Sequence, residues 1–380
     1  MLLLLHQRFY ITVQIISKVD FFDNCFKQHL YFVQTVSHLF FGRNNIHKRR
    51  RFLMKKFFVV FLAMITCVFP LAGCGSDDGT IKINEVTHSI FYAPLYVAME
   101  LGYFEKEGIT IELTNGGGSD KSMTAVLSGD ADVGLMGPET AIYVHEGKKD
   151  DFVQIFGQLT KRDGSFLVAR QNIANFNYEN MQNSHVIMGR RGGMPAMTLQ
   201  YILNQNGYID GQNITMNYDI QFNLIAPTFA NGTGDYVTLF EPTASQLVQE
   251  GKGYIVSSIG KASGEIPYTA FMAKKSFIDK NQDLLEKFLN CIYEATKYVM
   301  TTDNATVAKV LAPQFAGTSE SLIASSLKNY KDNDTWMTTP AMTKASFDRL
   351  QDVMQNAGEL GSRANFDDIV NNNIAKKIGK

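Results

Sequence analysis

Cys74, one of four cysteines in the chain, ends the tetrapeptide Leu71-Ala72-Gly73-Cys74. The basic pair Lys55-Lys56 and an apolar run at 57–69 precede it, and a polar stretch at 75–79 follows. A basic start, a short apolar run and small residues before one cysteine are typical of a bacterial lipoprotein signal peptide. We expect a signal peptidase to cut before Cys74, whose sulfur would then carry a lipid. The alternative is a buried core helix that ends in Ala-Gly-Cys, which the flexible polar stretch disfavours.

This signal predicts that translation begins at Met54. The 53 residues before it hold eight Lys or Arg, only two acids and four of the seven histidines, and no helical or strand period persists through them. The run Lys48-Arg49-Arg50-Arg51 matches a translated ribosome-binding site. We expect residues 1–53 to be a mistaken upstream extension. A genuine basic extension is the alternative.

Two segments place glycines at the start of an expected helix, an arrangement that suits an anion. The segment Arg190-Arg191-Gly192-Gly193-Met194-Pro195 combines guanidinium groups with bare backbone amides and a helix dipole. The three glycines at 116–118 stand before another expected helix. The alternatives are a solvated surface charge for either arginine and a plain turn at 116–118.

Carboxylates and hydroxyls stand where other expected strands end. Glu241 lies in Phe240-Glu241-Pro242 and can accept hydrogen bonds from a ligand amine, or instead cap the helix that follows. Gly137-Pro138-Glu139-Thr140 ends a second strand at a helix start, where Thr140 can hydrogen-bond a ligand.

Aromatic side chains offer faces on which a planar ligand can stack. In the loop 88–92, which begins with His88, Phe91 or Tyr92 would face the ligand, or both would pack inside the fold. Trp336 is the only tryptophan and lies in a polar segment between helices. It would either plug a lobe of the fold or line the ligand site.

Composition excludes several function classes. Residues 74–380 carry 26 Lys or Arg against 35 Asp or Glu, a net charge near −9 that argues against nucleic acid and anionic membrane surfaces as partners. Only Cys74 and Cys291 of the four cysteines lie there, and Cys291 sits in a helical apolar pattern typical of a core residue. No zinc-type spacing, phosphate-binding loop or Ser/His/Asp set is present, so we expect no metal, no cofactor and no enzyme.

The elements that position these residues alternate between short apolar strands and helices, an order that predicts mainly parallel sheets with helices on both faces. The expected strands lie at 81–87, 110–113, 132–136, 152–159, 166–169, 186–188, 214–221, 236–240, 254–258 and 268–273. The expected helices lie at 94–106, 121–128, 140–145, 195–206, 227–230, 243–250, 281–301, 307–311, 322–330, 341–358 and 366–377.

A weak internal repeat predicts two lobes of similar build. Residues 132–141 align without gaps to 235–244, and in each segment a strand runs into a helix that starts with proline. Two such units would point strand ends and helix starts at a shared cleft. The expected crossovers lie near Ser165–Arg170 and Ile266–Phe271, with Asp163 close to the first and Tyr268 to the second. The candidate ligand-binding residues are therefore His88, Phe91, Tyr92, Gly137, Glu139, Thr140, Asp163, Arg191, Gly192, Gly193, Met194, Glu241, Tyr268 and Trp336.

Two of these segments carry a resemblance to a known family. Residues 93–109, APLYVAMELGYFEKEGI, and residues 127–134, LSGDADVG, resemble signatures of the SsuA/THI5-like (NMT1) family of substrate-binding proteins of ABC importers. The resemblance covers residues 81–380. It implies an α/β, two-lobed type II periplasmic-binding-protein fold, each lobe a mainly parallel sheet flanked by helices, with a helical C-terminal region.

The expected organisation follows from the signal and the resemblance. Residues 54–73 form the signal peptide, 74–80 a flexible tether, 81–165 the first part of lobe 1, 166–265 lobe 2, and 266–380 the return to lobe 1 with the C-terminal helices. The signal predicts a lipid anchor on the outer face of the cell membrane, and with the resemblance it implies a monomeric binding protein held there. It would close its lobes by a hinge motion and deliver a small molecule to a permease and its ATPase.

The ligand stays open at this point. The family includes binders of aliphatic sulfonates, taurine, nitrate and thiamine-type pyrimidines. Aromatic residues together with Glu241 and Glu139 favour an amine-bearing planar nutrient such as a thiamine-precursor aminopyrimidine. The glycine-rich helix starts and Arg191 keep an alkanesulfonate open. The rivals are a ligand-sensing lipoprotein without transport and an enzyme of the pyrimidine-synthase branch, whose cysteine-rich motif is missing here.

Overall fold

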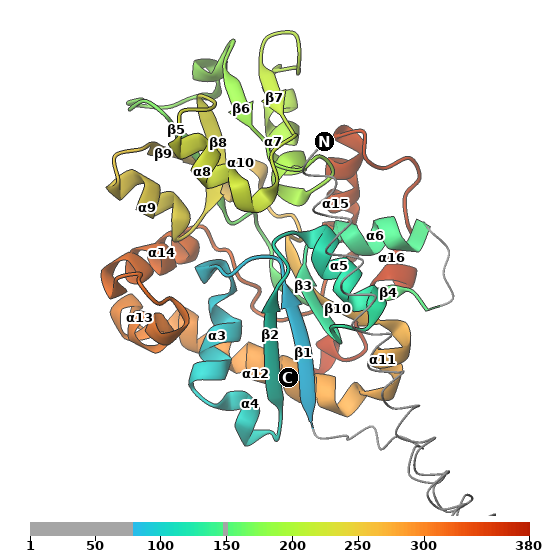
Figure 1. The fold of residues 1–380 in the computed structure, drawn as a ribbon. Helices are drawn as coiled ribbons and strands as arrows, with labels where there is room; N and C mark the ends of the chain where they lie inside the picture. The colour runs from blue at the N-terminus through green and yellow to red at the C-terminus, as the bar shows by residue number, and fades with distance from the viewer. Residues whose placement is uncertain (1–78, 147–150) are drawn as a thin grey trace, which may run out of the picture. The chain divides into compact units, whose positions relative to one another are not determined.

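The computed structural model describes residues 79–146 and 151–380, all of which belong to the unit Asp77–Lys380. The predicted signal peptide, the lipid-bearing Cys74 and the upstream extension lie outside the described residues. Two five-stranded sheets form the framework (Figure 1). Among the described helices, none has the length and apolar character needed to cross a bilayer.

The first sheet is built mostly from the N-terminal part of the described chain. Its strand order is β2-β1-β3-β10-β4. The strands β1, β2 and β3 pair in parallel, whereas β10 runs antiparallel to both β3 and β4. The strand bounds are β1 Thr80–Glu85, β2 Thr110–Asn115, β3 Val133–Met136, β4 Val153–Thr160 and β10 Thr269–Lys274.

The second sheet repeats this plan with a later stretch of the chain. Its order is β7-β6-β8-β5-β9, and β5 runs antiparallel to β8 and β9. In each sheet one strand therefore reverses and the other four point the same way, which confirms the predicted fold class. The strand bounds are β5 Ser165–Ala169, β6 His185–Ile187, β7 Thr215–Asn217, β8 Tyr236–Phe240 and β9 Tyr254–Ser258.

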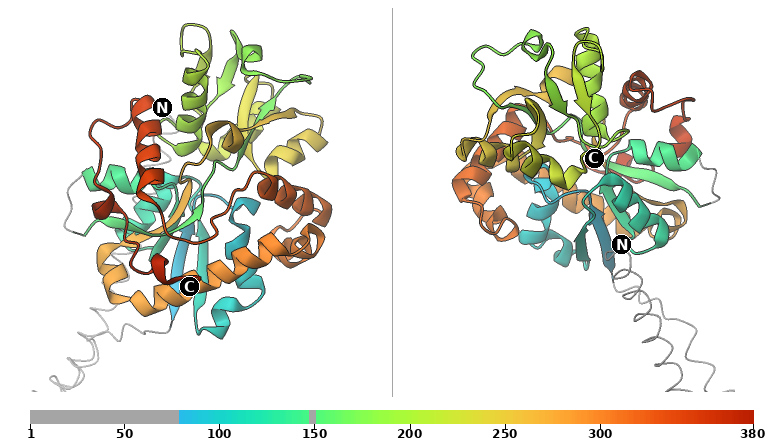
Figure 2. Two further views of the ribbon diagram at one scale, coloured as in Figure 1. Left: turned by 180° about the vertical axis from the view of Figure 1, so that it is seen from behind. Right: turned by 45° about the horizontal axis from the view of Figure 1, so that its top comes forward.

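Helices cover both sheets because the inner strands are apolar on both faces. All residues of β3, β4 and β5 are buried. On the first sheet, α5 packs on β3 and β1 (Figure 2). Phe288 of α12 packs against Phe156 and Phe271. The bounds of these and the other helices before β10 are α3 Ala93–Glu100, α4 Tyr103–Lys106, α5 Ser119–Ser128, α6 Glu139–Glu146, α7 Met194–Gln205, α8 Ile225–Ala230, α9 Thr243–Gln249 and α10 Ile259–Ser263.

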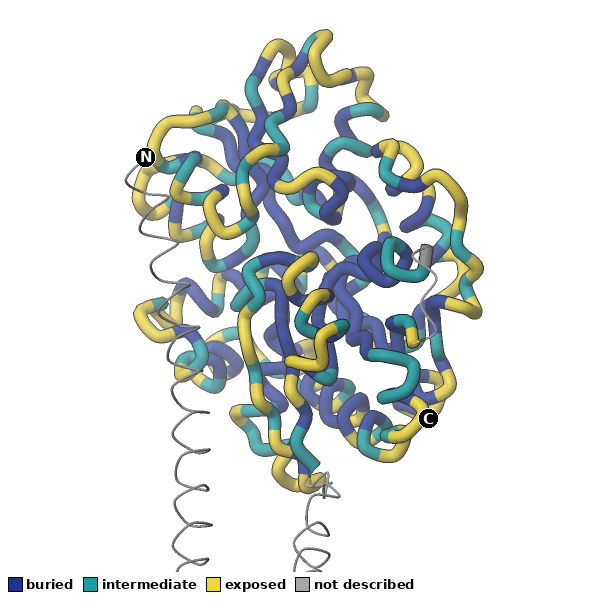
Figure 3. Tube along the Cα trace, turned by 45° about the vertical axis from the view of Figure 1, so that its right-hand side comes forward, coloured by how far each residue is buried: buried dark blue, intermediate teal, exposed yellow. Residues whose placement is uncertain are grey.

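The C-terminal region is helical and contacts both lobes. The helix α14 packs on α9 of the second lobe as well as on the short 3-10 turn Ile90–Tyr92 of the first, and α15 packs on both α6 and α7. Burial is concentrated in the inner strands and in the inward faces of these helices (Figure 3). The bounds are α11 Lys275–Lys280, α12 Gln282–Thr301, α13 Asn304–Leu311, α14 Glu320–Asp332, α15 Lys344–Asn356 and α16 Phe366–Ile369.

Three sequence expectations differ from the structure. The helix expected at 94–106 is interrupted, because Gly102 adopts a left-handed φ of 65° between α3 and α4. The strand expected at 214–221 is only Thr215–Asn217, and the residues after it form a loop. The helix expected at 366–377 ends at Ile369, because Val370 instead forms a parallel bridge with Ile155 of β4. The helix α10 was not expected.

Two short connections join the lobes side by side. The segments 161–164 and 264–268 run between the sheets, slightly before the expected crossovers, and are hydrogen-bonded to each other. The amide of Ile266 donates to the Lys161 carbonyl at 2.9 Å, and the amide of Tyr268 donates to the Thr160 carbonyl at 3.2 Å. A motion of one connection must therefore involve the other.

The packing of α10 against the first connection yields a stability prediction. A Cβ atom on Gly260 would overlap the backbone carbonyl of Asp163, whereas a Cβ on Gly361 would meet no atom within 4 Å. Gly260→Ala should lower the free energy of unfolding by about 1–3 kcal/mol, because the connection must shift. Gly361→Ala is the control and should change the free energy of unfolding by less than about 1 kcal/mol. Urea unfolding followed by circular dichroism measures both, and equal effects would contradict the packing argument.

Candidate functional site

A cleft of about 230 Å³ lies between the two sheets and takes its lining from both lobes. It opens at the ends of β1, β3, β6 and β8, the place where open α/β sheets bind ligands. From the first lobe come Val86, Thr87, Tyr92, Gly117, Gly118, Ser119, Asp120, Lys121, Gly137, Tyr268 and Thr269. From the second lobe come Met188, Gly189, Arg190, Gly193, Met194, Pro195, Ala196, Tyr218, Asp219, Ile220, Gln221, Phe222 and Phe240.

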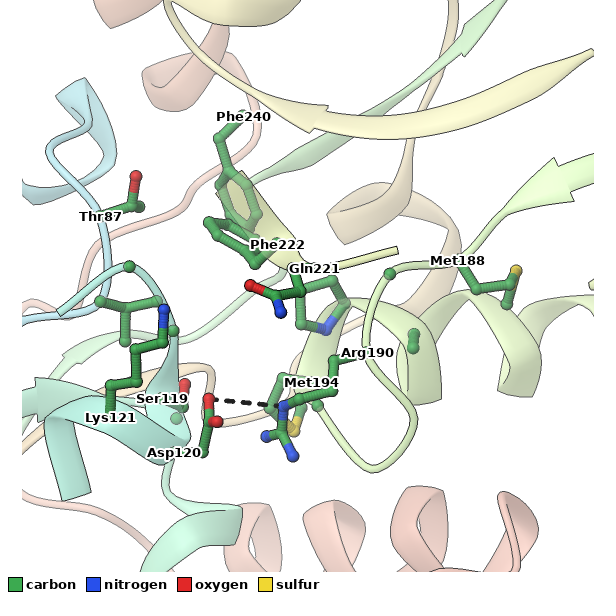
Figure 4. A pocket seen from close by; sticks show the side chains of 18 of the residues that line it. Thr87, Ser119, Asp120, Lys121, Met188, Arg190, Met194, Gln221, Phe222 and Phe240 are labelled. Atoms are coloured by element: carbon green, nitrogen blue, oxygen red, sulfur yellow. Dashed lines mark ion pairs between the residues drawn. The ribbon is translucent and has the colours of Figure 1, made fainter. Parts of the chain in front are cut away.

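One wall of the cleft is aromatic. The rings of Phe222 and Phe240 lie 6.0 Å apart between centroids (Figure 4). Those of Phe240 and Tyr268 lie 6.1 Å apart. Tyr92 and Tyr218 add two more ring systems to the lining. A cavity of about 150 Å³ holds a benzene ring, so this cleft accommodates a single substituted ring.

The opposite side carries charged groups from both lobes. The Arg190 Nε and the Asp120 Oδ1 lie 3.6 Å apart across the cleft, and both side chains are about half exposed (Figure 4). An ion pair this exposed contributes at most about 1 kcal/mol. The Tyr143 hydroxyl of α6 also crosses between lobes and donates to the Gly192 carbonyl at 3.1 Å. These contacts hold the lobes together around the cleft.

Two buried acids lie close to this cleft. Burial raises the pKa of Glu139 to about 7, and the nearby Arg190 guanidinium opposes the rise only in part. Burial likewise raises the pKa of Asp163 to about 7, although its Oδ1 accepts hydrogen bonds from the Ser165 amide and hydroxyl at 2.7 and 2.6 Å. In the described residues, no three His, Cys, Asp or Glu side chains gather as a metal site.

The structure brings five of the predicted residues together in the lining. These are Tyr92, Gly137, Gly193, Met194 and Tyr268. Gly193 caps the start of α7 with no side-chain partner, and Pro195 occupies its first turn, as expected for a helix start. The other nine candidates lie outside the lining: His88, Phe91, Glu139, Thr140, Asp163, Arg191, Gly192, Glu241 and Trp336.

Glu241 has its hydrogen-bonding capacity filled by the protein. Its carboxylate accepts from the Ser245 amide at 3.0 Å, the Ser245 hydroxyl at 2.7 Å and the Asn329 side chain at 2.7 Å, and the residue is 1% exposed. This is the capping role that the sequence left open as the alternative. The carboxylate is not available to a ligand amine in this conformation.

Trp336 and Phe91 form a plug under the cleft. The indole Nε1 of Trp336 donates to the Phe91 carbonyl at 2.9 Å, and both residues are buried. The Phe91 ring packs among Tyr92, Phe240, Tyr268 and Tyr330 with centroid distances of 5.4–5.8 Å. Of the two alternatives for each residue, packing inside the fold describes this structure.

The remaining candidates engage neighbouring protein groups. His88 lies between the Glu85 carboxylate and the Gln314 carbonyl, both at 2.8 Å, and the Glu85 hydrogen bond raises the pKa of His88. The Thr140 hydroxyl donates to the Gly137 carbonyl one turn back, at 2.7 Å. The Arg191 guanidinium stacks 3.9 Å from the Tyr218 ring centre, so Arg190 rather than Arg191 faces the cleft.

Sequence reasoning missed the loop that follows β7. Residues 218–221 were expected to continue the strand, yet this loop supplies Tyr218 to the cleft, and Phe222 follows directly after it in the lining. The paired asparagine and aspartate around Tyr218 were the available signal, because these residues favour turns over strands. The charged pair Asp120 and Lys121 was also missed, although the glycine turn before it was noted.

Comparisons with known proteins agree on one group. Residues 86–312 match the model of the NMT1-like family. The chain is 39% identical over 317 residues to the Bacillus subtilis (strain 168) protein named "Putative binding protein YtlA", which covers 83% of this chain and 95% of that protein.

Solved structures share the fold at low sequence identity. The alkanesulfonate-binding protein SsuA from Xanthomonas axonopodis pv. citri, bound to MOPS, matches with a TM-score of 0.64 and 15% identity over 78% of this chain and 100% of that one. The periplasmic nitrate-binding protein NrtA from Synechocystis PCC 6803 matches with a TM-score of 0.63 and 15% identity over 79% and 88%. These likenesses establish the fold of periplasmic binding proteins.

The environment of Glu241 predicts a structural variant. Glu241→Ala leaves the Ser245 and Asn329 donors unpaired and should lower the free energy of unfolding by about 2–5 kcal/mol. The exposed Glu250, at the opposite end of α9, is the control, and Glu250→Ala should change the free energy of unfolding by less than about 1 kcal/mol. Chemical denaturation measures both. A Glu241→Ala protein as stable as the wild type would contradict the capping role.

Burial of Asp163 predicts a pH dependence of stability. Its folded-state pKa near 7 exceeds the ordinary value of 3.8, so the folded protein binds the proton more tightly than the unfolded chain. The stabilisation is complete below about pH 4 and is lost as the pH rises to about 7, a change of up to about 4 kcal/mol. Asp163→Asn should therefore gain stability relative to the wild type over this range.

Unfolding in urea between about pH 4 and pH 8 measures this difference. Substitution of the exposed Asp130 by Asn is the control and should leave the pH profile of the wild type unchanged. Parallel profiles for the wild type and Asp163→Asn would show that Asp163 stays ionised in the folded protein.

Proposed function

This chain belongs to the NMT1-like family, and we propose that it is the solute-binding protein of an ABC importer. The observation that carries the proposal is the cleft lined from both lobes and bridged by Tyr143 and Gly192. The names of the compared proteins support it, since one describes a binding protein and others bind alkanesulfonate or nitrate. A binding and delivery role requires no catalytic group, and we propose no enzymatic activity.

The proposed mechanism is closure of two lobes around one solute. The paired connections 161–164 and 264–268 serve as the hinge. A ligand that contacts Tyr92 and Tyr268 on one side and Phe222 and Arg190 on the other binds the closed form more tightly, so it shifts the population toward closure. The permease and its ATPase would recognise this closed form and accept the solute.

We propose that a lipid on Cys74 anchors the protein to the outer face of the cell membrane, as a monomer. The support is the lipobox-like segment at 71–74 and the polar stretch at 75–79 that would act as a tether. Such an anchor keeps a released solute close to the permease. The mature protein would begin at Cys74 after removal of the signal peptide, residues 54–73.

For the ligand, we propose a small planar molecule that bears an amine, with a thiamine-precursor aminopyrimidine as the best candidate. The aromatic wall of Phe222, Phe240 and Tyr268 provides stacking faces, and the cleft volume of about 230 Å³ suits one substituted ring. An alkanesulfonate is the second candidate, since Lys121, Arg190 and the start of α7 can attract an anion.

A thermal-shift screen of the purified protein tests this function. The panel contains 4-amino-5-hydroxymethyl-2-methylpyrimidine, thiamine, taurine, ethanesulfonate and nitrate. A ligand at about 100 times its Kd adds about 2.7 kcal/mol of stability, which raises the Tm by several degrees. We expect the shift to disappear in Phe222→Ala, which removes an aromatic face of the cleft.

Phe277 of α11 supplies the matched control. It is half-buried like Phe222 but lies outside the cleft lining, so Phe277→Ala should keep the ligand-induced shift. A shift that survives Phe222→Ala would contradict the cleft as the binding site. Loss of uptake of the responding solute in cells that lack the gene completes the test of transport.

A further inference from the structure

The Glu139 carboxylate is buried without a hydrogen-bond partner. Glu139 is 0% exposed, and no side chain among the described residues donates a hydrogen bond to its carboxylate. The amides of Glu139 itself and of Met194 lie close enough only to oppose the rise of its pKa. We propose that Glu139 is the acceptor for a positively charged nitrogen of the ligand, an amine or amidine, and that this nitrogen replaces a proton which Glu139 carries in the empty cleft. The inference rests on the proposed function and names the charge class of the solute.

The carboxylate lies directly beneath the floor of the cleft. A Cβ atom on Gly137 would overlap the Glu139 carboxylate, so the two groups are in close contact, and Gly137 lines the cleft. Burial raises the pKa of the Tyr92 and Tyr268 phenols, and the negative charge of Glu139 contributes to both rises. The amide of Met194 and the guanidinium of Arg190 face Glu139 from the second lobe. All of these neighbours line the cleft.

The protein does not neutralise this carboxylate by itself. An ionised carboxylate without a partner is costly to bury, and such a group takes up a proton instead. The pKa of Glu139 is raised to about 7 for this reason, because burial outweighs the opposing effects of Arg190 and the nearby amides. Arg190 already forms an ion pair with Asp120, with 3.6 Å between its Nε and the Asp120 Oδ1. A ligand cation would supply the missing counter-charge.

The charges around the cleft also favour a cation. Lys121 and Arg190 balance Asp120 and Asp219 in the lining, and Glu139 beneath the floor adds one further acid. Its carboxylate is close to the Met194 amide at the start of α7, the place where an anionic ligand would otherwise bind. A sulfonate there would bind only while Glu139 keeps its proton, whereas a cation binds the ionised carboxylate.

Other titratable groups near Glu139 do not replace this role. On α6 itself, His145 lies at the far end of the helix and pairs with Asp368 of α16 at 3.9 Å. Tyr92 and Tyr268 have raised pKa values and stay neutral near pH 7. Asp163, the other buried acid with a pKa raised to about 7, has its Oδ1 held by two hydrogen bonds from Ser165. We therefore assign the exchange between a proton and a ligand cation to Glu139.

Glu139 is also the first residue of α6, where an acid stabilises the helix dipole. A helix-stabilising role alone predicts that Glu139→Gln lowers the Tm and leaves ligand selectivity unchanged. A cation-binding role predicts that selectivity itself changes. The two roles therefore differ in a readout that does not depend on stability.

Isothermal titration calorimetry with matched probes tests the inference. The probes are 4-amino-5-aminomethyl-2-methylpyrimidine and agmatine as cations, the 5-hydroxymethyl analogue as the less charged partner, and ethanesulfonate as an anion. The wild type should prefer the aminomethyl compound over the hydroxymethyl analogue by about tenfold or more, since each such factor corresponds to about 1.4 kcal/mol. Glu139→Gln should remove this preference.

Proton linkage supplies the second readout. At about pH 6, titrations in buffers of different ionisation enthalpy should show release of nearly one proton for each aminomethyl ligand bound, and affinity should rise with pH until about pH 7. Glu139→Gln should abolish the release. Glu359→Gln is the control, because Glu359 lies near Gly192 at the rim, outside the lining, and should keep both properties.

The failures of the two proposals are distinguishable. Binding of ethanesulfonate alone, lost in Phe222→Ala, would overturn this inference and leave the proposed function standing. Cation binding that Glu139→Gln does not weaken would overturn it as well. If no probe of either charge binds, both the inference and the proposed ligand classes are contradicted.

Discussion

The geometry of the cleft depends on one buried junction around Glu241. The Ser89 hydroxyl of the first lobe donates to the Glu241 carbonyl at 2.6 Å, and the Glu241 amide donates to the Tyr330 hydroxyl at 2.9 Å. The Glu241 carboxylate meanwhile holds the start of α9 and Asn329 of α14. The end of β8, the loop after β1 and a C-terminal helix are thereby held at one point. Because β8 and the loop after β1 both contribute to the cleft lining, its aromatic wall has a defined position.

The same junction explains why the C-terminal helices contact both lobes. Tyr330 of α14 meets the Glu241 backbone and the Phe91 ring, and Trp336 closes the space below by its hydrogen bond to Phe91. The segment after α14 also pairs with the first connection between the lobes, where the backbone amide of Lys161 donates to the Thr335 carbonyl at 2.9 Å. Closure would therefore bend the connections while the aromatic plug below the cleft stays intact.

The two acids that follow β3 and β8 show how similar segments take different roles. In Gly137-Pro138-Glu139 the acid follows the proline and enters α6, whereas in Glu241-Pro242 it precedes the proline and caps α9. Glu241 accepts hydrogen bonds from three protein donors, whereas no side chain donates to the Glu139 carboxylate. Perturbed, unpartnered acids of this kind concentrate at functional sites.

The sequence alone determined the local structure and the fold class. Apolar runs and their period placed most strands and helices within a few residues, and the repeat of strand and proline-started helix indicated two lobes, because these patterns depend on neighbours along the chain. The tertiary structure decided which polar side chains are satisfied. Trp336 meets Phe91 245 positions away, and Asn329 meets Glu241 88 positions away. No local pattern encodes such partners, so only the fold could assign Glu241 to the framework and leave Glu139 without a partner beneath the cleft.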